Sequence, residues 1–289
     1  MSPRFSIVPT LGAQHTAIVV MRPRVFGLSL TRAMLRYRLR PMSIGVSCAV
    51  DPADLLAPIP PLPGVTTGRH VELRLIDEPL VDLALYSLGA ISCSPAYSSG
   101  GDGATSACLA RLSVAERLVR ASTTLQDGLR FVVLDAWRSM SVQRHLFDSY
   151  VAELLEANPN WSNGEGQRQA ARFVTNPYEV VPPHCTGGAI DLTLCTADGL
   201  PVMCGTDFDD FSEKSATRYF EVAVDSGAIL RADEETALAN RRILFNALTS
   251  AGFTNYPAEW WHFDYGDAFW DQAVGCPALY GPADNPKRT

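Results

Sequence analysis

The chain of 289 residues has a formal net charge of −7 and a pI near 5.2. It offers no basic stripe to neutralise phosphates, so the composition argues against a nucleic-acid partner and leaves small polar or cationic ligands open. Its apolar fraction of 47% is ordinary for a globular protein, and no apolar run reaches the roughly 18 residues of a membrane span.

Cysteine usage indicates the compartment. The seven cysteines are an odd number and include no CxxC pair, and the chain is long enough to fold without disulfide bonds. The pattern therefore favours reduced thiols and a cytoplasmic location over a disulfide framework.

The first 65 residues differ in composition from the rest. Residues 1 to 50 contain seven arginines and no Asp or Glu, which is typical of a transit peptide or a basic arm; alternatively, the true start is Met21, Met34 or Met42. Residues 51 to 65 carry five prolines and predict an extended linker. We therefore expect an N-terminal extension and linker over 1–65 and a folded domain over 66–289.

From residue 66 onward the pattern predicts alternating strands and helices. Strands are expected at 70–75 and 131–134, and a helix over about 102–126. Apolar spacing from Val142 to Leu155 predicts a second helix, with Ser139 or Ser141 as N-cap, and a short helix should end near Val174.

The second half of the chain continues the mixed pattern. Prolines at 177, 182 and 183 should hold the chain extended ahead of His184. Strands are expected at 188–195 and 259–265, with residues 200–203 pairing back on the first as a hairpin. A strong helix should span 233–250, N-capped by an acidic group and closed by Gly252.

Two short stretches, 183–191 (PHCTGGAID) and 259–262 (EWWH), hold the residues of a candidate metal site. Zinc in hydrolytic sites takes three ligands from His and carboxylate and leaves a fourth position open, and His184, Asp191 and His262 supply such a set. Glu259 lies three residues before His262, where its carboxylate could reach a water held by the metal; a general base so placed contributes on the order of 10²- to 10⁴-fold.

Taken singly, each of these residues favours a structural role. A lone histidine is usually a hydrogen-bonded structural residue, the Gly187–Gly188 pair usually a turn, and Trp260 and Trp261 usually core. Their conjunction at these spacings favours the metal site.

At this point a family resemblance is evident. The pattern His-x-x-Gly-x-Ala-x-Asp at 184–191, followed by Glu-x-x-His at 259–262, resembles the zinc D-alanyl-D-alanine peptidases of the M15 class. The forms AIDLTL (189–194) and EWWH resemble more narrowly the VanX-type D-Ala-D-Ala dipeptidases, because the carboxypeptidase and endopeptidase relatives usually show Pro-Trp-His. The resemblance covers roughly residues 66 to 273 and implies a single α+β domain with a central, mainly antiparallel sheet and flanking helices.

The resemblance also implies roles. His184, Asp191 and His262 would bind one zinc ion, and Glu259 would be the catalytic base. Arg138, in the segment 135–138 that matches the family's Asp-Gly-Tyr-Arg, would stabilise the oxyanion. Asp209, or its neighbour Asp210, would bind the ammonium of a dipeptide.

The chain departs from the family pattern at three places. Pro182 stands where the family usually has Ser, which removes a hydroxyl and a backbone N–H near the substrate. The family's Asn-Phe pair is not evident over residues 85–97. Cys185, beside a ligand, could be drawn to zinc, but in an extended segment its side chain would point to the other face, which favours a buried inert thiol.

The implied reaction is hydrolysis of free D-Ala-D-Ala. The alternatives are a D,D-carboxypeptidase acting on peptidoglycan stem peptides, a dipeptidase of other specificity, and a zinc-binding module without turnover. The expected partner is a small dipeptide, with no nucleic acid and no membrane span; the sequence assigns no oligomeric state.

Overall fold

The computed structural model describes residues 52–65, 76–97 and 105–284. The strand predicted at 70–75 lies outside these residues, as does the start of the helix predicted from 102. Within the described ranges, no helix is both long and apolar enough to cross a membrane.

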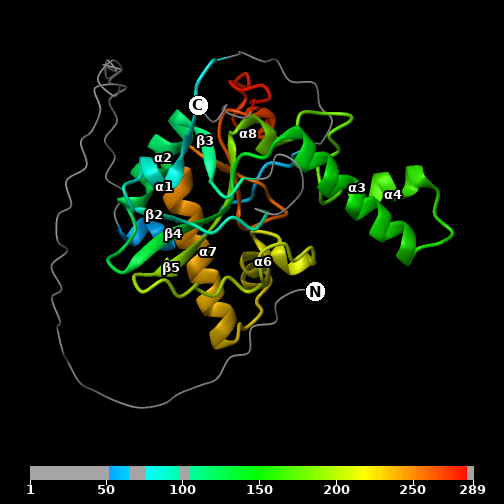
Figure 1. The fold of residues 1–289 in the computed structure, drawn as a ribbon. Helices are drawn as coiled ribbons and strands as arrows, with labels where there is room; N and C mark the ends of the chain where they lie inside the picture. The colour runs from blue at the N-terminus through cyan, green and yellow to red at the C-terminus, as the bar shows by residue number, and fades with distance from the viewer. Residues whose placement is uncertain (1–51, 66–75, 98–104, 285–289) are drawn as a thin grey trace, which may run out of the picture. The chain divides into compact units, whose positions relative to one another are not determined.

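A five-stranded sheet organises the domain (Figure 1). Its strand order is β2-β4-β5-β7-β6, and every neighbouring pair is antiparallel except β2 with β4, which is parallel. This confirms the predicted α+β class with a mainly antiparallel sheet. The strands are β2 (Ile91–Cys93), β4 (Leu129–Asp135), β5 (Ala189–Thr196), β6 (Thr254–Asn255) and β7 (His262–Asp264).

Alternation along β5 separates the core from the opposite face of the sheet. Ile190, Leu192 and Leu194 join the main hydrophobic cluster, whereas Asp191 and Thr193 point the other way. All five are buried, so the strand reads in sequence as a continuous apolar run bearing one carboxylate.

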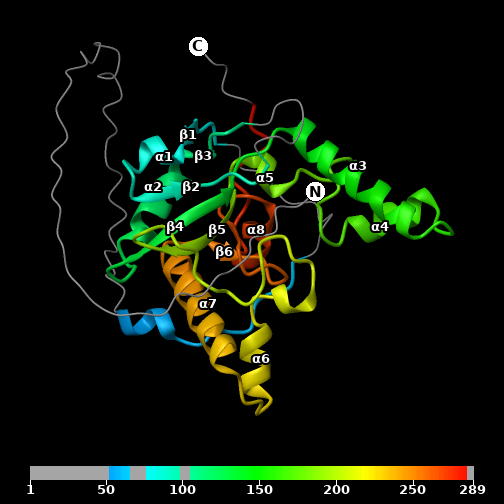
Figure 2. The same cartoon turned by 60° about the horizontal axis from the view of Figure 1, so that its bottom comes forward.

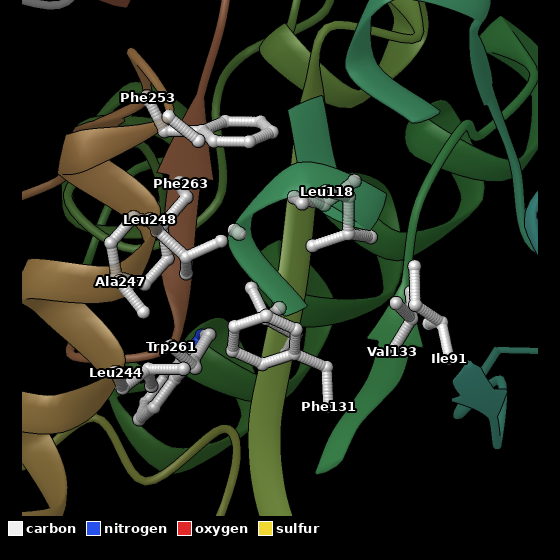
Figure 3. Close-up of a cluster of buried hydrophobic side chains, with 14 of the residues drawn as sticks. Ile91, Leu118, Phe131, Val133, Leu244, Ala247, Leu248, Phe253, Trp261 and Phe263 are labelled. Atoms are coloured by element: carbon white, nitrogen blue, oxygen red, sulfur yellow. The ribbon is translucent and has the colours of Figure 1, made fainter. Parts of the chain in front are cut away.

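Two helices cover the core face of the sheet. Figure 3 shows Leu118 of α2 (Leu112–Ser122) and Leu244 and Leu248 of α7 (Ala232–Ser250) turned toward Phe131 and Phe263 of the strands. Each is buried, and complete burial of such a side chain contributes about 1.5–3 kcal/mol.

The helix predicted over 102–126 is shorter than expected. Residues Leu109–Arg111 form strand β3, which pairs antiparallel with β1 (Leu80–Asp82), and the helix α2 begins only at Leu112. The apolar spacing alone fitted a helix over these residues, but their backbone pairs with β1 instead. A short helix, α1 (Leu83–Tyr86), follows β1.

The pair α3 (Met140–Ala157) and α4 (Asn163–Ala170) extends away from the sheet in both views (Figures 1 and 2). Ser139 is the N-cap of α3, as predicted, and accepts a hydrogen bond from the Val142 N–H at 3.2 Å. The two helices share a small core of their own around Phe147, Val151 and Ala170.

The second half of the chain follows the predicted pattern with corrected boundaries. Helix α7 confirms the helix at 233–250, but its N-cap is Arg231, and the acidic residue acts from inside the helix: Glu234 accepts a hydrogen bond from the Arg231 N–H at 3.2 Å. The predicted hairpin forms over residues 200–202: Pro201 bridges to Cys195, and the Val202 N–H donates to the Leu194 carbonyl at 3.1 Å. The remaining elements are α5 (Pro183–Thr186), the 3-10 turn η3 (Glu213–Ser215), α6 (Tyr219–Asp225) and α8 (Ala268–Val274).

Residues 52–65 pack on the domain, although the sequence predicted an extended linker there. They begin with a 3-10 turn, η2 (Pro52–Leu56), and Leu55 and Ile59 lie in the main core. The Ile59 N–H donates a 2.8 Å hydrogen bond to buried Glu221. Prolines predicted the extended backbone but not the burial of the apolar residues between them.

Candidate metal centre

A row of polar side chains crosses three neighbouring strands on the face opposite the core. Asp135 of β4 is in register with Asp191 of β5, which is in register with His262 of β7. A β-bulge between Val133 and Asp135 shifts the register by one residue, and without it Asp135 would stand opposite core-facing Ile190. The bulge therefore brings Asp135 into the row.

His184 reaches this row from the helical turn α5. The sequence predicted an extended segment here, and that prediction was wrong from Pro183 onward, because Pro183 occupies the first helical position, where its fixed φ and missing N–H are tolerated. Gly187 ends the turn at φ 74°, a left-handed conformation that favours glycine. Gly188 lies so close to the Tyr265 carbonyl that a Cβ would be 2.6 Å from its oxygen.

Three predicted ligands converge. One donor atom each from His184, Asp191 and His262 lies within 4.8 Å of the other two, and all three residues are buried. His262 Nδ1 is 2.9 Å from Asp191 Oδ1, and His184 Nε2 is 3.3 Å from Asp191 Oδ2. Among the described residues this is the only such cluster of metal-binding groups.

Neighbouring groups fix which nitrogen of each histidine faces the cluster. His184 Nδ1 lies 2.8 Å from the Ala136 carbonyl, so Nδ1 carries the proton and Nε2 presents a lone pair. His262 Nε2 lies 2.8 Å from Asp264 Oδ1, which leaves Nδ1 facing the cluster. Histidines that bind metals are held this way by carbonyl or carboxylate partners, so the site fits a divalent cation.

Neighbouring charges shift the pKa values of two of the three predicted ligands. Burial alone would lower the pKa of His262, but Asp264 and Asp191 outweigh it and raise the pKa well above its usual value. Burial would raise the pKa of Asp191, yet the two histidines hold it below its usual range. Two buried carboxylates, Asp191 and Asp264, thus stabilise positive charge at His262, whether it is carried by the ring or by a bound cation.

Glu259 borders the cluster from the turn before β7. Its Oε2 is 3.9 Å from His262 Nδ1, and its side chain is 15% exposed. Burial raises the pKa of Glu259 to about 8, and Asp191 and Asp209 add to the rise, while His262 and Arg138 oppose it. A divalent cation held by the neighbouring ligands would favour the carboxylate form. The predicted strand from 259 begins only at His262, so Glu259 lies in a turn.

Arg138 borders the cluster on the other side, following β4. Its Nη2 is 3.6 Å from Asp191 Oδ2, and its side chain is 11% exposed, so it is no surface arginine. Asp135 accepts a hydrogen bond from Nε, and Gln143 accepts one from Nη1 at 3.1 Å. The guanidinium also lies over the Tyr97 ring, 4.7 Å from its centroid.

Asp209 lies in the loop before η3 and is tied to the site by Tyr97, whose hydroxyl donates to its carboxylate. Its backbone has φ 60°, a left-handed conformation that Asp tolerates better than most residues. Asp210 turns away and accepts a 2.8 Å hydrogen bond from the Ser212 N–H. Of the two candidates, Asp209 is therefore the one that contacts Tyr97, whose ring lies under the Arg138 guanidinium.

Cys185 and the two tryptophans have structural positions. Burial raises the pKa of the Cys185 thiol to about 12, and it is not part of the cluster. Trp260 and Trp261 belong to the core.

Sequence reasoning missed three groups that hold the site: Asp264, Gln143 and Tyr97. Only Asp264 left a signal, because it lies two residues after His262 and side chains at that spacing share one face of a strand.

Comparison with known proteins places the chain in a family. The Peptidase_M15 family model, described as D-Ala-D-Ala dipeptidase, matches residues 102–278. A D-alanyl-D-alanine dipeptidase of Synechocystis sp. is 30% identical over 207 residues, which cover 67% of this chain and 84% of that protein. A dipeptidase of the same name from Escherichia coli K12 is 28% identical over 163 residues, 56% of this chain and 68% of that protein.

Two further proteins match less of the chain or match it more weakly. A D-alanyl-D-alanine dipeptidase of Enterococcus faecalis is 34% identical over 113 residues, 37% of this chain and 50% of that protein. A crystal structure of the D,D-pentapeptidase VanY with Zn(II) covers 62% of this chain and 88% of its own, at 14% identity and a TM-score of 0.29. By its family match and its Synechocystis relative, the chain belongs to the M15 family of D-Ala-D-Ala dipeptidases and is an enzyme of that zinc metallopeptidase family.

Proposed function

We propose that this chain hydrolyses the peptide bond of free D-alanyl-D-alanine, with one zinc ion held by His184, Asp191 and His262. The observation that carries the proposal is the arrangement around these three groups: a carboxylate, Glu259, borders them on one side and a fixed cation, Arg138, on the other. Two imidazoles and one carboxylate are a donor set of catalytic zinc sites. Zinc bound there would polarise the scissile carbonyl and lower the pKa of a water molecule to about 7.

Glu259 acts as the general base in this proposal. Its carboxylate lies beside the ligand cluster without belonging to it, where it can accept a proton from the attacking water and pass that proton to the leaving amine. The general base is a proposal supported by this position and by the family's motif.

Arg138 acts as the oxyanion partner. Its guanidinium keeps its charge at any physiological pH, and Asp135 and Gln143 hold it in one orientation. Donors fixed in advance stabilise developing charge without reorganising, which is where such groups are most effective.

Asp209 confines the reaction to free dipeptides, since its carboxylate would bind the substrate ammonium. The Tyr97 hydroxyl orients one oxygen and leaves the other for a ligand. A D,D-carboxypeptidase cleaves substrates whose amine is acylated, so it has no use for this carboxylate.

The predicted cytoplasmic location is part of the proposal. All six cysteines that fall within the described residues carry free thiols, which fits a reducing compartment.

Comparing kcat/KM on D-Ala-D-Ala and on its N-acetyl form tests the substrate. We expect wild type to prefer the free dipeptide, and Asp209→Asn to lose at least about 30-fold of that preference, mainly through KM, because a buried charge loses its partner. Asp210→Asn is the matched control and should behave as wild type. Preference of the wild type for the acylated substrate would assign the chain to the carboxypeptidases instead.

A further inference from the structure

The chain segment after α8 returns to the metal site. Residues 279–283, called the tail strap below, lie beyond residue 278, where the family match ends. The Ala283 N–H donates a 2.8 Å hydrogen bond to the Cys185 carbonyl. The Ala283 carbonyl accepts a 3.1 Å hydrogen bond from the indole Nε1–H of Trp137. One residue of the strap thus binds two separate segments of the site.

Each of these two segments carries one residue of the proposed reaction. Trp137 immediately precedes Arg138, and Cys185 immediately follows His184. The segments also bind each other directly: the Arg138 N–H donates to the His184 carbonyl at 3.2 Å, and His184 Nδ1 contacts the Ala136 carbonyl at 2.8 Å. Together with the two hydrogen bonds of Ala283, these contacts form a network of four hydrogen bonds around His184 and Arg138.

The strap is itself firmly anchored, so it can hold other groups in place. The Tyr280 N–H donates to the Gly266 carbonyl at 2.9 Å, and the Tyr280 side chain is 1% exposed. Its hydroxyl is hydrogen-bonded to Ser113, and Arg111 Nη2 donates to the Gly281 carbonyl at 3.3 Å. The anchors lie on α2, on β3 and in the turn after β7, and Arg111 also donates from Nε to the Thr186 carbonyl of the His184 turn at 2.8 Å.

We propose that the tail strap is a positioning element of the active site, which fixes the His184 turn relative to the Arg138 segment through Ala283. Trp137 is then a positioning residue and not merely a core tryptophan. The inference rests on the proposed function, because it concerns the residues assigned to zinc and to the oxyanion. Without Ala283 the two segments keep their direct hydrogen bonds but lose the acceptor and donor that fix their spacing, and even a 1 Å misplacement of catalytic groups costs up to about 10²-fold in rate.

The test uses two variants that remove this brace in different ways. Trp137→Phe keeps the aromatic packing but deletes the donor to Ala283, and a chain shortened after Pro282 removes Ala283 while keeping the Tyr280 and Gly281 anchors. Trp270→Phe is the matched control for the first, because the Trp270 indole donates to the Gly252 carbonyl at 3.2 Å, remote from the ligands. A chain shortened after Asp284 is the control for the second.

The readouts are the zinc dissociation constant by chelator competition, kcat and KM on D-Ala-D-Ala, and the melting temperature. We expect Trp137→Phe and the shorter truncation to weaken zinc binding and to lower kcat by about tenfold each, the lower end of what outer partners of a metal site contribute. KM should stay close to the wild-type value, and both controls should match wild type in zinc affinity and kcat.

Zinc affinity and kcat within about twofold of wild type in both strap variants would overturn the inference, as would equal losses in Trp270→Phe. The zinc measurement needs no substrate. If wild type fails to hydrolyse D-Ala-D-Ala, the proposed function fails, while the zinc affinities of the four variants still decide whether the strap positions the His184 turn.

Discussion

Replacing Asp264 by Asn tests how the site prepares His262 for a metal. The Asp264 carboxylate is 1% exposed and lies 2.8 Å from His262 Nε2. It holds the proton on Nε2, so that Nδ1 faces Asp191 and His184 with a lone pair. Asparagine keeps the shape of the side chain but removes its charge, and its amide can turn its NH₂ group toward the ring.

The expected loss follows from what such partners contribute elsewhere. Outer partners of metal ligands typically contribute 10- to 100-fold in metal affinity, which corresponds to about 1.4–2.7 kcal/mol. We therefore expect the zinc dissociation constant of Asp264→Asn to rise by about 10- to 100-fold. The fold should survive, since the substitution conserves volume.

The assay is chelator competition at fixed pH, with the melting temperature of the zinc-free protein measured alongside. Asp225→Asn is the control, because Asp225 is an exposed carboxylate paired with Arg218 and remote from the ligands. If Asp264→Asn folds and binds zinc within about twofold of wild type, the carboxylate does not set the tautomer and the reasoning fails.

Three further predictions concern charge and pH. Arg138→Ala should lower kcat by about 10²- to 10³-fold with little change in zinc content, and a rise in KM at unchanged kcat would assign Arg138 to ground-state binding. Burial raises the pKa of Asp209 to about 6, so KM for the free dipeptide should rise as pH falls from 7 to 5, whereas a parallel rise for the N-acetyl substrate would argue against an ammonium site. Burial would raise the pKa of Glu221, but Arg242 and the Ile59 N–H hold it lower. Glu221→Gln should therefore lower the free energy of unfolding by about 1.5–3 kcal/mol at pH 7. This difference between variant and wild type should disappear as pH falls from the unfolded-state pKa of about 4.3 through the lower folded-state pKa. A stability difference that stays the same at low pH in denaturant titrations would refute this prediction.

Much of the site could be predicted because its residues lie in short, recognisable patterns. His184 and Asp191 are close in sequence, and Glu259 and His262 are three residues apart. The sheet that joins these stretches was predictable from the apolar run of β5, whose period of two also places Asp191 opposite the core residues.

Other features depend on partners distant in the chain, and so left little local signal. The bulge that aligns Asp135 with Asp191 is set by pairing between β4 and β5. The strand β3 forms because β1 lies beside it, and its spacing alone fitted a helix. Ala283 contacts Cys185 and Trp137 through its backbone N–H and carbonyl groups. Because residues of almost every type carry these groups, the sequence could not predict the contact.

The position of Glu259 beside the ligand cluster is the centre of the account, and Glu259→Gln tests it most directly. The decisive measurement is single-turnover hydrolysis of D-Ala-D-Ala by a variant whose zinc content has been verified. The proposed role predicts that the variant keeps one zinc ion per chain and loses at least about 10²- to 10⁴-fold in rate. A zinc-loaded variant that hydrolyses the dipeptide at the wild-type rate would contradict the assignment of Glu259 as the base.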